Sequence, residues 1–193
     1  MALYTGKGDK GDTGLFGCNQ RISKSSAIAE ALGSLDEINS FLGLIKVKAK
    51  DSNAISEGKS IEFKINDLPF DEIVNTVQKN LFIVQAEVAG TPMTIEESKV
   101  KEVEVIIAQV EKELPPIHSF FISGGTELTA LFDVARTFVR RAERRVVGVS
   151  EEGERKVGEF TLAYMNRLSS LFYALARLTN HISGIVEQSP DYK

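Results

Sequence analysis

The sequence predicts an all-α protein, an up-and-down bundle of five helices, and three observations lead to this fold class. Long segments repeat apolar residues at intervals of three and four, which is the period of an amphipathic helix. Proline and glycine separate these segments, while strand-like alternation is weak throughout. The chain has 193 residues, 42% of them hydrophobic, which is enough for one domain with a single core. We therefore treat residues 1–193 as one domain.

The first helix is predicted over residues 23–50. Ser23 or Ser25 is expected to cap its N-terminus. Residues 51–69 lose the helical period and end in proline, so we expect a surface loop there. The apolar stripe of the first helix consists of Ile28, Leu32, Leu35, Ile38, Leu42 and Ile45.

The second and third helices are predicted over residues 70–90 and 94–114. Thr94 precedes Glu97 by three residues, which is the sequence pattern of a capping box at the start of the third helix. Two consecutive prolines end this helix, because proline cannot continue a helical hydrogen-bond ladder.

The fourth and fifth helices are predicted over residues 126–149 and 152–187, after a short apolar loop. The fifth contains the largely apolar stretch FTLAYMNRLSSLFYALARLTNHISGIV. The buried stripe of the fourth consists of Leu128, Leu131, Ala135, Phe138, Ala142 and Val146.

Composition limits the partners and the location of the protein. The net charge of −4 and the pI near 5.4 argue against a surface built for nucleic acid or anionic membranes. Cys18 is the only cysteine, so a reducing compartment is expected. The N-terminus has no apolar leader, and no apolar stretch reaches the roughly 18 residues that cross a bilayer. These features predict a cytoplasmic protein.

Residues 4–17, YTGKGDKGDTGLFG, spell the glycine pattern of a dinucleotide-binding turn through Gly6, Gly8 and Gly11. That fingerprint requires a preceding strand and a helix that opens at its last glycine. Only three residues precede Tyr4, and the helical period begins near residue 23. A Walker-type loop also fails, because no Gly-Lys pair is followed by Ser or Thr at the required spacing. Taken alone, residues 1–22 form a flexible arm.

Residues 135–145, ARTFVRRAERR, hold five of the nine arginines in the chain. Arg136, Arg140 and Arg144 are spaced at i, i+4 and i+8, so they stack along one face of the fourth helix. Like charges at this spacing repel, so either ion pairs, for example with Glu143, or a bound anion must offset them.

Two features favour an anion site at a contact between helices or subunits. The row borders the buried stripe, and the first helix carries Asp36 and Glu37 at a matching depth. If one arginine of the row formed a planar, bidentate ion pair with one of these carboxylates, the other guanidiniums would be free to bind phosphate oxygens.

Other polar and aromatic residues allow two interpretations each. Asn166 and Arg167 interrupt an apolar helix, either as satisfied hydrogen-bonding groups or as ligand contacts. Phe120 and Phe121 precede two glycines and either plug an end of the bundle or form the wall of a flat ligand site. The sequence has no Glu-x-x-His and no Cys-x-x-Cys, so no metal-ligating residues are predicted.

Four stretches together, YTGKGDKGDTG, EALGSLDEINSFLG, ARTFVRRAERR and YMNRLSSLFYALAR, resemble the ATP:cob(I)alamin adenosyltransferases of the PduO type. The resemblance covers nearly the whole chain, except residues 51–69 and the tail. It implies a homotrimer of ferritin-like five-helix bundles with active sites between subunits. There the 5′-deoxyadenosyl group of ATP passes to cob(I)alamin, with Mg²⁺ present, forming adenosylcobalamin and releasing triphosphate. It also implies two partner proteins, a reductase and an adenosylcobalamin-dependent acceptor enzyme.

The resemblance also implies roles for individual residues. Arg136, Arg140 and Asp36 would be catalytic, with Arg136 and Asp36 paired across the subunit interface. Phe120 would lie under the corrin ring. The chain departs from the family pattern at Asp133, often His, and at Ser123, often Pro. The chain also departs from the family pattern at Gly6 and Lys7. ATP would be bound by Thr5, Gly6, Lys7, Gly8, Thr13 and Lys24 of one subunit and by Arg140, Glu143, Arg144 and Asn166 of its neighbour.

Two other functions fit the residues. The first is a trimeric ATP-binding bundle with a regulatory role and no transferase activity. The second is a non-enzymatic bundle whose arginine row binds an anionic partner or RNA. Acidic residues that follow the row, such as Glu151 and Glu152, argue against nucleic acid.

Overall fold

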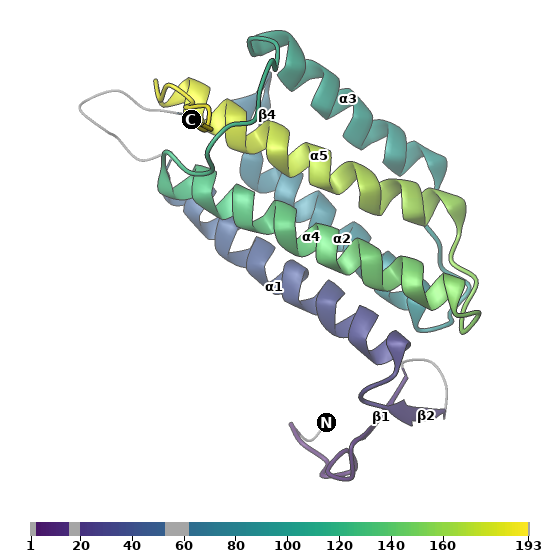
Figure 1. Ribbon diagram of the computed structural model, residues 1–193. Helices are drawn as coiled ribbons and strands as arrows, with labels where there is room; N and C mark the ends of the chain where they lie inside the picture. The colour runs from purple at the N-terminus through teal and green to yellow at the C-terminus, as the bar shows by residue number, and fades with distance from the viewer. Residues whose placement is uncertain (1–2, 16–19, 53–61, 193) are drawn as a thin grey trace.

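The computed structural model describes residues 3–15, 20–52 and 62–192, and within them it contains five long helices. Successive helices run in opposite directions, so the predicted up-and-down bundle is confirmed (Figure 1). The helices are α1 (Ala27–Ser52), α2 (Phe70–Val88), α3 (Glu97–Glu113), α4 (Glu127–Glu151) and α5 (Glu159–Ile182).

Two short β-hairpins accompany the helices, which the weak strand signals of the sequence did not predict. Strands β1 (Asp12–Gly14) and β2 (Arg21–Ser23) pair antiparallel within the N-terminal arm. Strands β3 (Lys64–Ile65) and β4 (Leu68–Pro69) pair antiparallel just before α2. Phe63 and Ile65 are buried, so this end of the expected 51–69 surface loop joins the core. Residues 53–61 of that loop lie outside the described part of the chain, as does Cys18.

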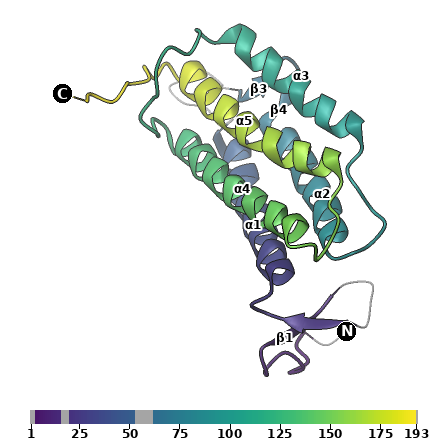
Figure 2. The ribbon, with the colours of Figure 1, turned by 45° about the vertical axis from the view of Figure 1, so that its right-hand side comes forward.

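The helices pack in a fixed order of neighbours. Helix α1 contacts α2 and α4, α4 contacts α5, and α3 lies on α5 (Figure 2). The predicted stripes of α1 and α4 face this core, although Leu32, Leu131 and Phe138 are only partly buried. Phe132 and Val139, which the prediction left out, are fully buried on α4. The core is therefore continuous between α1, α4 and α5.

Two predicted helix caps are wrong. Helix α1 begins at Ala27, because residues 21–23 are paired in β2, and Ser26 Oγ accepts a hydrogen bond from the Ala29 N–H at 3.3 Å. Helix α3 begins at Glu97 after Glu96, whose side chain makes no capping bond, so Thr94 caps nothing. Thr126 is the N-cap of α4, and its side chain accepts from the Thr129 N–H.

The fifth helix is shorter than predicted at both ends, and glycine explains both differences. Helix α4 ends at Glu151, and Gly153 then adopts a φ of +74° that ends the helix. Helix α5 consequently starts at Glu159 instead of 152. It ends at Ile182, before Gly184 with a φ of +70°, instead of at 187.

A buried carboxylate of α2 fixes the start of α5. Glu87 is 9% exposed and accepts from the Gly158 N–H at 2.7 Å and from the Thr161 hydroxyl at 2.5 Å. Both donors belong to the first turn of α5, where the helix dipole favours a negative charge. Glu87 thus joins α2 to the start of α5 through Gly158, which is 71 residues away in the sequence.

The N-terminal arm extends past the end of the bundle at which α1 begins (Figures 1 and 2). In the described part of the chain, no helix is both long and apolar enough to cross a membrane.

Candidate functional site

The five arginines of α4 divide into two sets. Two of them face α1 and form ion pairs within the chain, Arg141 with Glu37 and Arg145 with Glu30, the latter at 3.5 Å. The Arg141 guanidinium also lies over the Phe138 ring, 4.9 Å from its centre. For Arg141 and Arg145, ion pairs within the chain therefore offset the positive charge. The row predicted as an anion site, Arg136, Arg140 and Arg144, makes no ion pair among the described residues.

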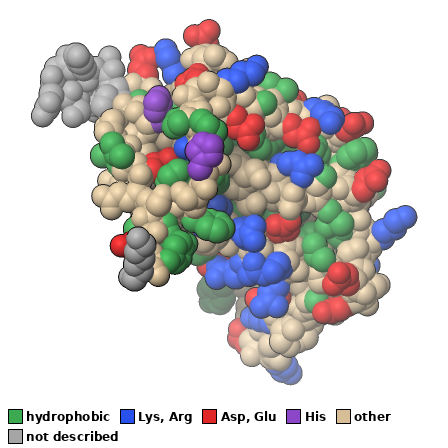
Figure 3. Space-filling model, turned by 45° about the horizontal axis from the view of Figure 1, so that its top comes forward, with side chains coloured by type: hydrophobic (Ala, Val, Ile, Leu, Met, Phe, Trp, Pro, Cys, Tyr) green, Lys and Arg blue, Asp and Glu red, His purple; other side chains and the backbone are tan. Residues whose placement is uncertain are grey.

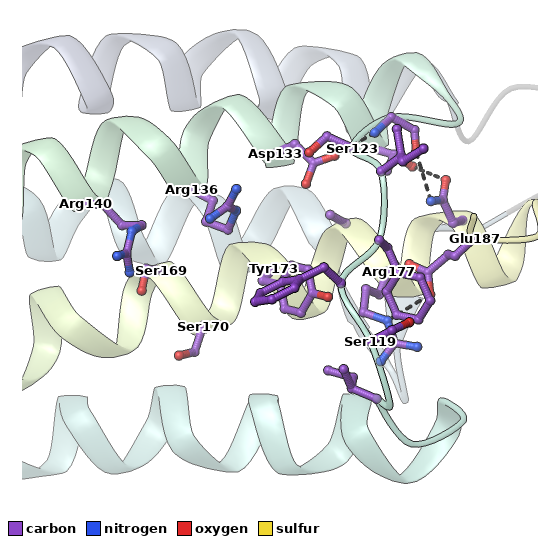
Figure 4. Close-up of a pocket in the computed structure, with 18 of the residues that line it drawn as sticks. Ser119, Ser123, Asp133, Arg136, Arg140, Ser169, Ser170, Tyr173, Arg177 and Glu187 are labelled. Carbon is purple, nitrogen blue, oxygen red and sulfur yellow. Dashed lines mark hydrogen bonds and ion pairs between the residues drawn. The ribbon is translucent and has the colours of Figure 1, made fainter. Parts of the chain in front are cut away.

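This unpaired row connects two cavities. Arg136 and Arg140 project from α4 toward α5 and line a cavity of about 590 Å³ beneath residues 117–124 (Figure 4). Arg144 lines a second cavity of about 460 Å³ with Ser25, at the end of the bundle where the arm begins. At a rise of about 1.5 Å per residue, the row is about 12 Å long. Figure 3 shows basic side chains gathered on one face beside a hydrophobic group.

Arg136 and Asp36 do not meet within the chain. Asp36 is exposed on α1, and the Nε of Arg136 is buried without a hydrogen-bond partner among the described residues. A buried, unpaired guanidinium N–H is costly, so this N–H is available to a partner that the described residues do not supply. The cross-subunit pair with Asp36 stays a prediction.

Glu143 and Asn166, both predicted to bind ATP, are brought together by α4 and α5. Asn166 Nδ2 donates to Glu143 Oε1 at 2.9 Å, and Asn166 Oδ1 accepts from Arg167 Nη1 at 2.8 Å. Arg167 Nε then donates to Glu104 of α3 at 3.0 Å, and this hydrogen bond lowers the pKa of the Glu104 carboxyl. Asn166 is exposed, so its network lies on the surface and is open to a ligand.

The predicted ATP-binding residues of the arm surround one ion pair. Arg21 forks onto both carboxylate oxygens of Asp12 at 2.7 Å, and it also donates to the Lys7 carbonyl at 2.8 Å. The Arg21 guanidinium lowers the pKa of Asp12. Lys24 Nζ donates to the Gly8 carbonyl at 3.0 Å, so these two predicted site residues are adjacent.

Backbone conformation explains a glycine in the arm. Gly6 has a φ of +66°, a conformation that other residues rarely adopt, and Thr5 accepts a weak 3.4 Å bond from the Lys7 N–H across this turn. Thr13 lies in β1, paired with Ile22. Among the described residues, no hydrogen bond or ion pair connects residues 5–13 with α4 or α5. The arm and the arginine row are thus separate parts of one chain.

Phe120 lies on the loop that covers the first cavity. Its side chain is 80% exposed, although it lines the cavity. The loop ends at Gly124, whose N–H donates to Asp133 Oδ2 at 2.8 Å and whose carbonyl accepts from Asn180 Nδ2 at 3.0 Å. Burial raises the pKa of Asp133, while the Gly124 N–H partly opposes this effect.

Replacing Gly125 requires the loop or the Asn180 side chain to move. Its φ is +131°, and a Cβ there would lie 2.2 Å from Asn180 Oδ1. Asn180 in turn accepts from the Thr129 hydroxyl at 2.7 Å. Sequence reasoning missed Asn180 and its neighbour Arg177, although polar residues in the apolar C-terminal half of α5 were a usable signal.

The fold and the site together define a helical-bundle protein that can hold a polyanion along α4 beside a larger, partly apolar ligand. Residues 3–179 match the family model for cobalamin adenosyltransferase, and the chain belongs to this family.

Similar proteins agree with this membership. A corrinoid adenosyltransferase of Bacillus subtilis is 35% identical over 189 residues, which cover 96% of this chain and 90% of that protein. The corrinoid adenosyltransferase PduO of Salmonella typhimurium is 35% identical over 184 residues, and this chain spans only 49% of its length. A solved structure of a PduO-type ATP:corrinoid adenosyltransferase variant from Lactobacillus reuteri, complexed with cobalamin and ATP, has a TM-score of 0.83 at 26% identity, covering 99% of this chain and 97% of that one.

Proposed function

We propose that this protein transfers the 5′-deoxyadenosyl group of ATP to cob(I)alamin, forming adenosylcobalamin and releasing triphosphate. Membership of the cobalamin adenosyltransferase family supports this reaction. The structural observation that carries it is the unpaired row of Arg136, Arg140 and Arg144, which connects a cavity beneath Phe120 with the end of the bundle that bears the glycine-rich arm.

The row suits a reaction in which a polyphosphate leaves. Cobalt(I) donates its electron pair to the 5′ carbon of ATP, so a cobalt–carbon bond forms while the bond from that carbon to the triphosphate oxygen breaks. The departing triphosphate takes the bonding electrons. Guanidiniums held at the leaving group stabilise this charge, and holding both substrates in line lowers the barrier further. No protein base is needed, because cobalt is the nucleophile.

ATP lies along the row in this proposal, with Arg140, Arg144, Glu143 and Asn166 of one chain around it. Among the described residues, Arg140 has no carboxylate partner, and Arg144 donates only to the Arg140 carbonyl at 3.0 Å, so both guanidiniums are available to phosphate. Asn166 is exposed and can turn its amide to the nucleotide.

The arm closes the same site from a neighbouring chain. Its glycines leave room for backbone N–H groups to approach phosphate oxygens, and Lys24 adds a charge beside Gly8. Within the part of the chain that the structure describes, the arm makes no bond to the row, so a cyclic trimer with one site at each interface is the simplest assembly that joins them.

Mg²⁺ accompanies the nucleotide in this proposal. The described residues include no group of three or more His, Cys, Asp or Glu that could form a metal cage. Mg²⁺ that is bound mainly by phosphate oxygens needs only one protein carboxylate. Glu143, which lies between Arg140 and Arg144 on α4, can supply it. Bound there, Mg²⁺ would offset charge on the triphosphate.

The corrinoid occupies the cavity of about 590 Å³, with Phe120 against the lower face of the ring. The phenylalanine would exclude a lower axial ligand from cobalt, which favours the four-coordinate Co(II) state that is easier to reduce. Arg136, at the junction of cavity and row, would pair with Asp36 of the neighbour and so satisfy its buried Nε.

Mixing the protein with ATP and chemically reduced cobalamin tests the proposal directly. We expect the absorbance change that accompanies a cobalt–carbon bond, together with release of triphosphate. ATP binding without either product would instead support the regulatory alternative. In a cell, we propose that a cytoplasmic reductase supplies the electrons and that an adenosylcobalamin-dependent enzyme accepts the product.

A further inference from the structure

Arg177 is the one arginine of the C-terminal half of α5, and it lies deep in the molecule. Its residue exposure is 5%, among mainly apolar neighbours such as Leu175 and Leu178. A buried guanidinium is retained only where partners satisfy it, so its contacts indicate what it holds in place.

Three contacts join Arg177 to two other segments. Its Nε donates to Glu187 Oε2 at 2.9 Å, and its Nη2 donates to the Pro115 carbonyl at 3.3 Å. Its guanidinium carbon also lies 5.0 Å from the centre of the Phe121 ring, within the range of a cation–π contact. Arg177 therefore connects α5 with the C-terminal tail (residues 183–192) and with the loop of residues 115–124 that carries Phe120.

The tail and the loop are also bonded to each other. The Ile122 N–H donates to the Gln188 carbonyl at 2.8 Å, and the Ser119 and Ser189 hydroxyls are 2.7 Å apart. Figure 4 shows Arg177 and Glu187 beside Ser119, at one end of the cavity that Arg136 and Arg140 line at the other. Phe120, by contrast, is 80% exposed, so its own side chain does little to fix its position.

We infer that the Arg177–Glu187 ion pair positions Phe120 for the corrinoid by clamping the 115–124 loop to the C-terminal tail. Arg177 is a positioning residue, because it acts on the ligand through the loop. The Arg177–Glu187 ion pair holds the 115–124 loop at a fixed distance from the cavity. The cation–π contact between Arg177 and Phe121 keeps Phe121 against α5, so that Phe120 faces the ligand. This inference rests on the proposed corrinoid site.

The test compares Glu187→Gln, Arg177→Met and the double variant with the wild-type protein. Glu187 belongs to the tail, so Glu187→Gln keeps the fold even if Arg177→Met does not. Lys50→Met is a matched control, because it removes an ion pair with Asp71 that lies between α1 and α2.

We expect the Glu187→Gln variant to lower kcat about tenfold and to raise the KM for cobalamin, while the KM for ATP stays within twofold. The fraction of four-coordinate Co(II) in optical spectra should fall toward that of Phe120→Ala. The double variant should be no worse than the worse single variant, since both remove one interaction. Wild-type values for kcat and for the four-coordinate fraction in Glu187→Gln would overturn the inference.

Amide hydrogen exchange separates this failure from failure of the proposed function. Loss of the clamp should speed exchange at Ile122, whose N–H bonds the tail, in both single variants but not in Lys50→Met. Unchanged exchange at Ile122 would refute the clamp whatever the kinetics. A wild-type protein that forms no cobalt–carbon bond would refute the proposed function, and with it the positioning role.

Discussion

Arg140 is the residue on which the proposed reaction depends most directly. Its guanidinium lines the cavity and has no carboxylate partner in the described chain, so truncation creates no unpaired charge. We expect Arg140→Ala to lower kcat by two or more orders of magnitude. Removing one preorganised donor at a developing charge typically costs roughly 10²–10³ in rate. Steady-state kinetics with ATP and cob(I)alamin provide the measurement.

Arg141 supplies the matched control for this change. It is the next residue on α4, but its guanidinium is occupied by Glu37 and by the Phe138 ring. We expect Arg141→Ala to keep kcat within about threefold, since it removes a surface ion pair worth roughly 1 kcal/mol or less. Equal losses in both variants would indicate that the row has no special role, and sedimentation must show that Arg140→Ala keeps its assembly.

Asp133 should make stability depend on pH, because burial raises its pKa above that of the unfolded chain. The folded protein then loses stability as the pH rises through this raised pKa, when the half-buried carboxyl ionises. Asp133→Asn avoids this loss and keeps an oxygen for the Gly124 N–H. We expect its Tm to exceed that of the wild type by roughly 1–2 °C at pH 7. The difference should shrink as the pH falls toward about 4.

Thermal denaturation across this pH range checks the prediction, with Asp133→Ala as its companion. The alanine removes the acceptor as well as the charge, so it should lower Tm at every pH. A Tm for Asp133→Asn below that of the wild type at pH 7 would show that the Gly124 N–H and Arg136 together stabilise the carboxylate more than burial disfavours it.

At the scale of elements, Glu87 is the main link between α2 and the start of α5. Glu87→Ala leaves the half-buried Gly158 N–H and the buried Thr161 hydroxyl without their acceptor. We expect this change to lower the free energy of unfolding by about 2–4 kcal/mol. At roughly 2–4 °C per kcal/mol for a chain of this size, Tm should fall by roughly 5–15 °C.

Calorimetry of Glu87→Ala, Glu87→Gln and Lys79→Ala tests this link. Glutamine keeps one acceptor oxygen and should fall between alanine and the wild type. Lys79 is exposed on the same helix, so its replacement should change the free energy of unfolding by less than about 0.5 kcal/mol. A Tm for Glu87→Ala within 2 °C of the control would contradict the role of this carboxylate.

The sequence predicted the helices better than their ends. The stripe from Ile28 to Ile45 has the helical period, and burial of that stripe is the force that forms α1. Ends depend on single contacts with distant residues, such as Glu87 with Gly158, which periodicity cannot reveal. The hairpin at β3 and β4 is only two residues per strand, too short for alternation to stand out.

The candidate site was predictable where its residues share one helix. Arg136, Arg140 and Arg144 form a row through spacing alone, and the sequence identifies it. Spacing on α4 could not separate them from Arg141 and Arg145, since that division requires the position of α1 and its acids. Asn180 was missed because its role lies in bonds to Thr129 and Gly124, which are more than 50 residues away.

At the scale of the whole molecule, the proposed function makes the arm and the row two halves of one site, which the described residues of a single chain do not join. The arm extends past the end of the bundle. Among the described residues, the hydrogen bonds of residues 3–24 stay within residues 3–26, apart from the bond of Arg155 Nη2 to Gln20 Oε1 at 3.1 Å. In the proposed cyclic trimer, each arm would meet the row of one neighbour, so every site would draw on two chains.

Mixed trimers test this division of the site. Lys24→Ala damages the arm and leaves the row intact, while Arg140→Ala damages the row and leaves the arm intact. Each variant alone should be nearly inactive. When the two are unfolded together and refolded at equal concentration, half of the arms and half of the rows are intact. Random assembly then gives an intact pair at roughly one quarter of the sites, and activity should recover to about that fraction of the wild type.

The same mixture distinguishes the alternative arrangement. If arm and row served one chain, every chain would carry one damaged half, and mixing would restore nothing. Mixing the folded variants without unfolding is the control, since stable trimers exchange no subunits and should stay inactive. Recovery near one quarter would require chains to share their sites, because no single chain in the mixture carries both an intact arm and an intact row.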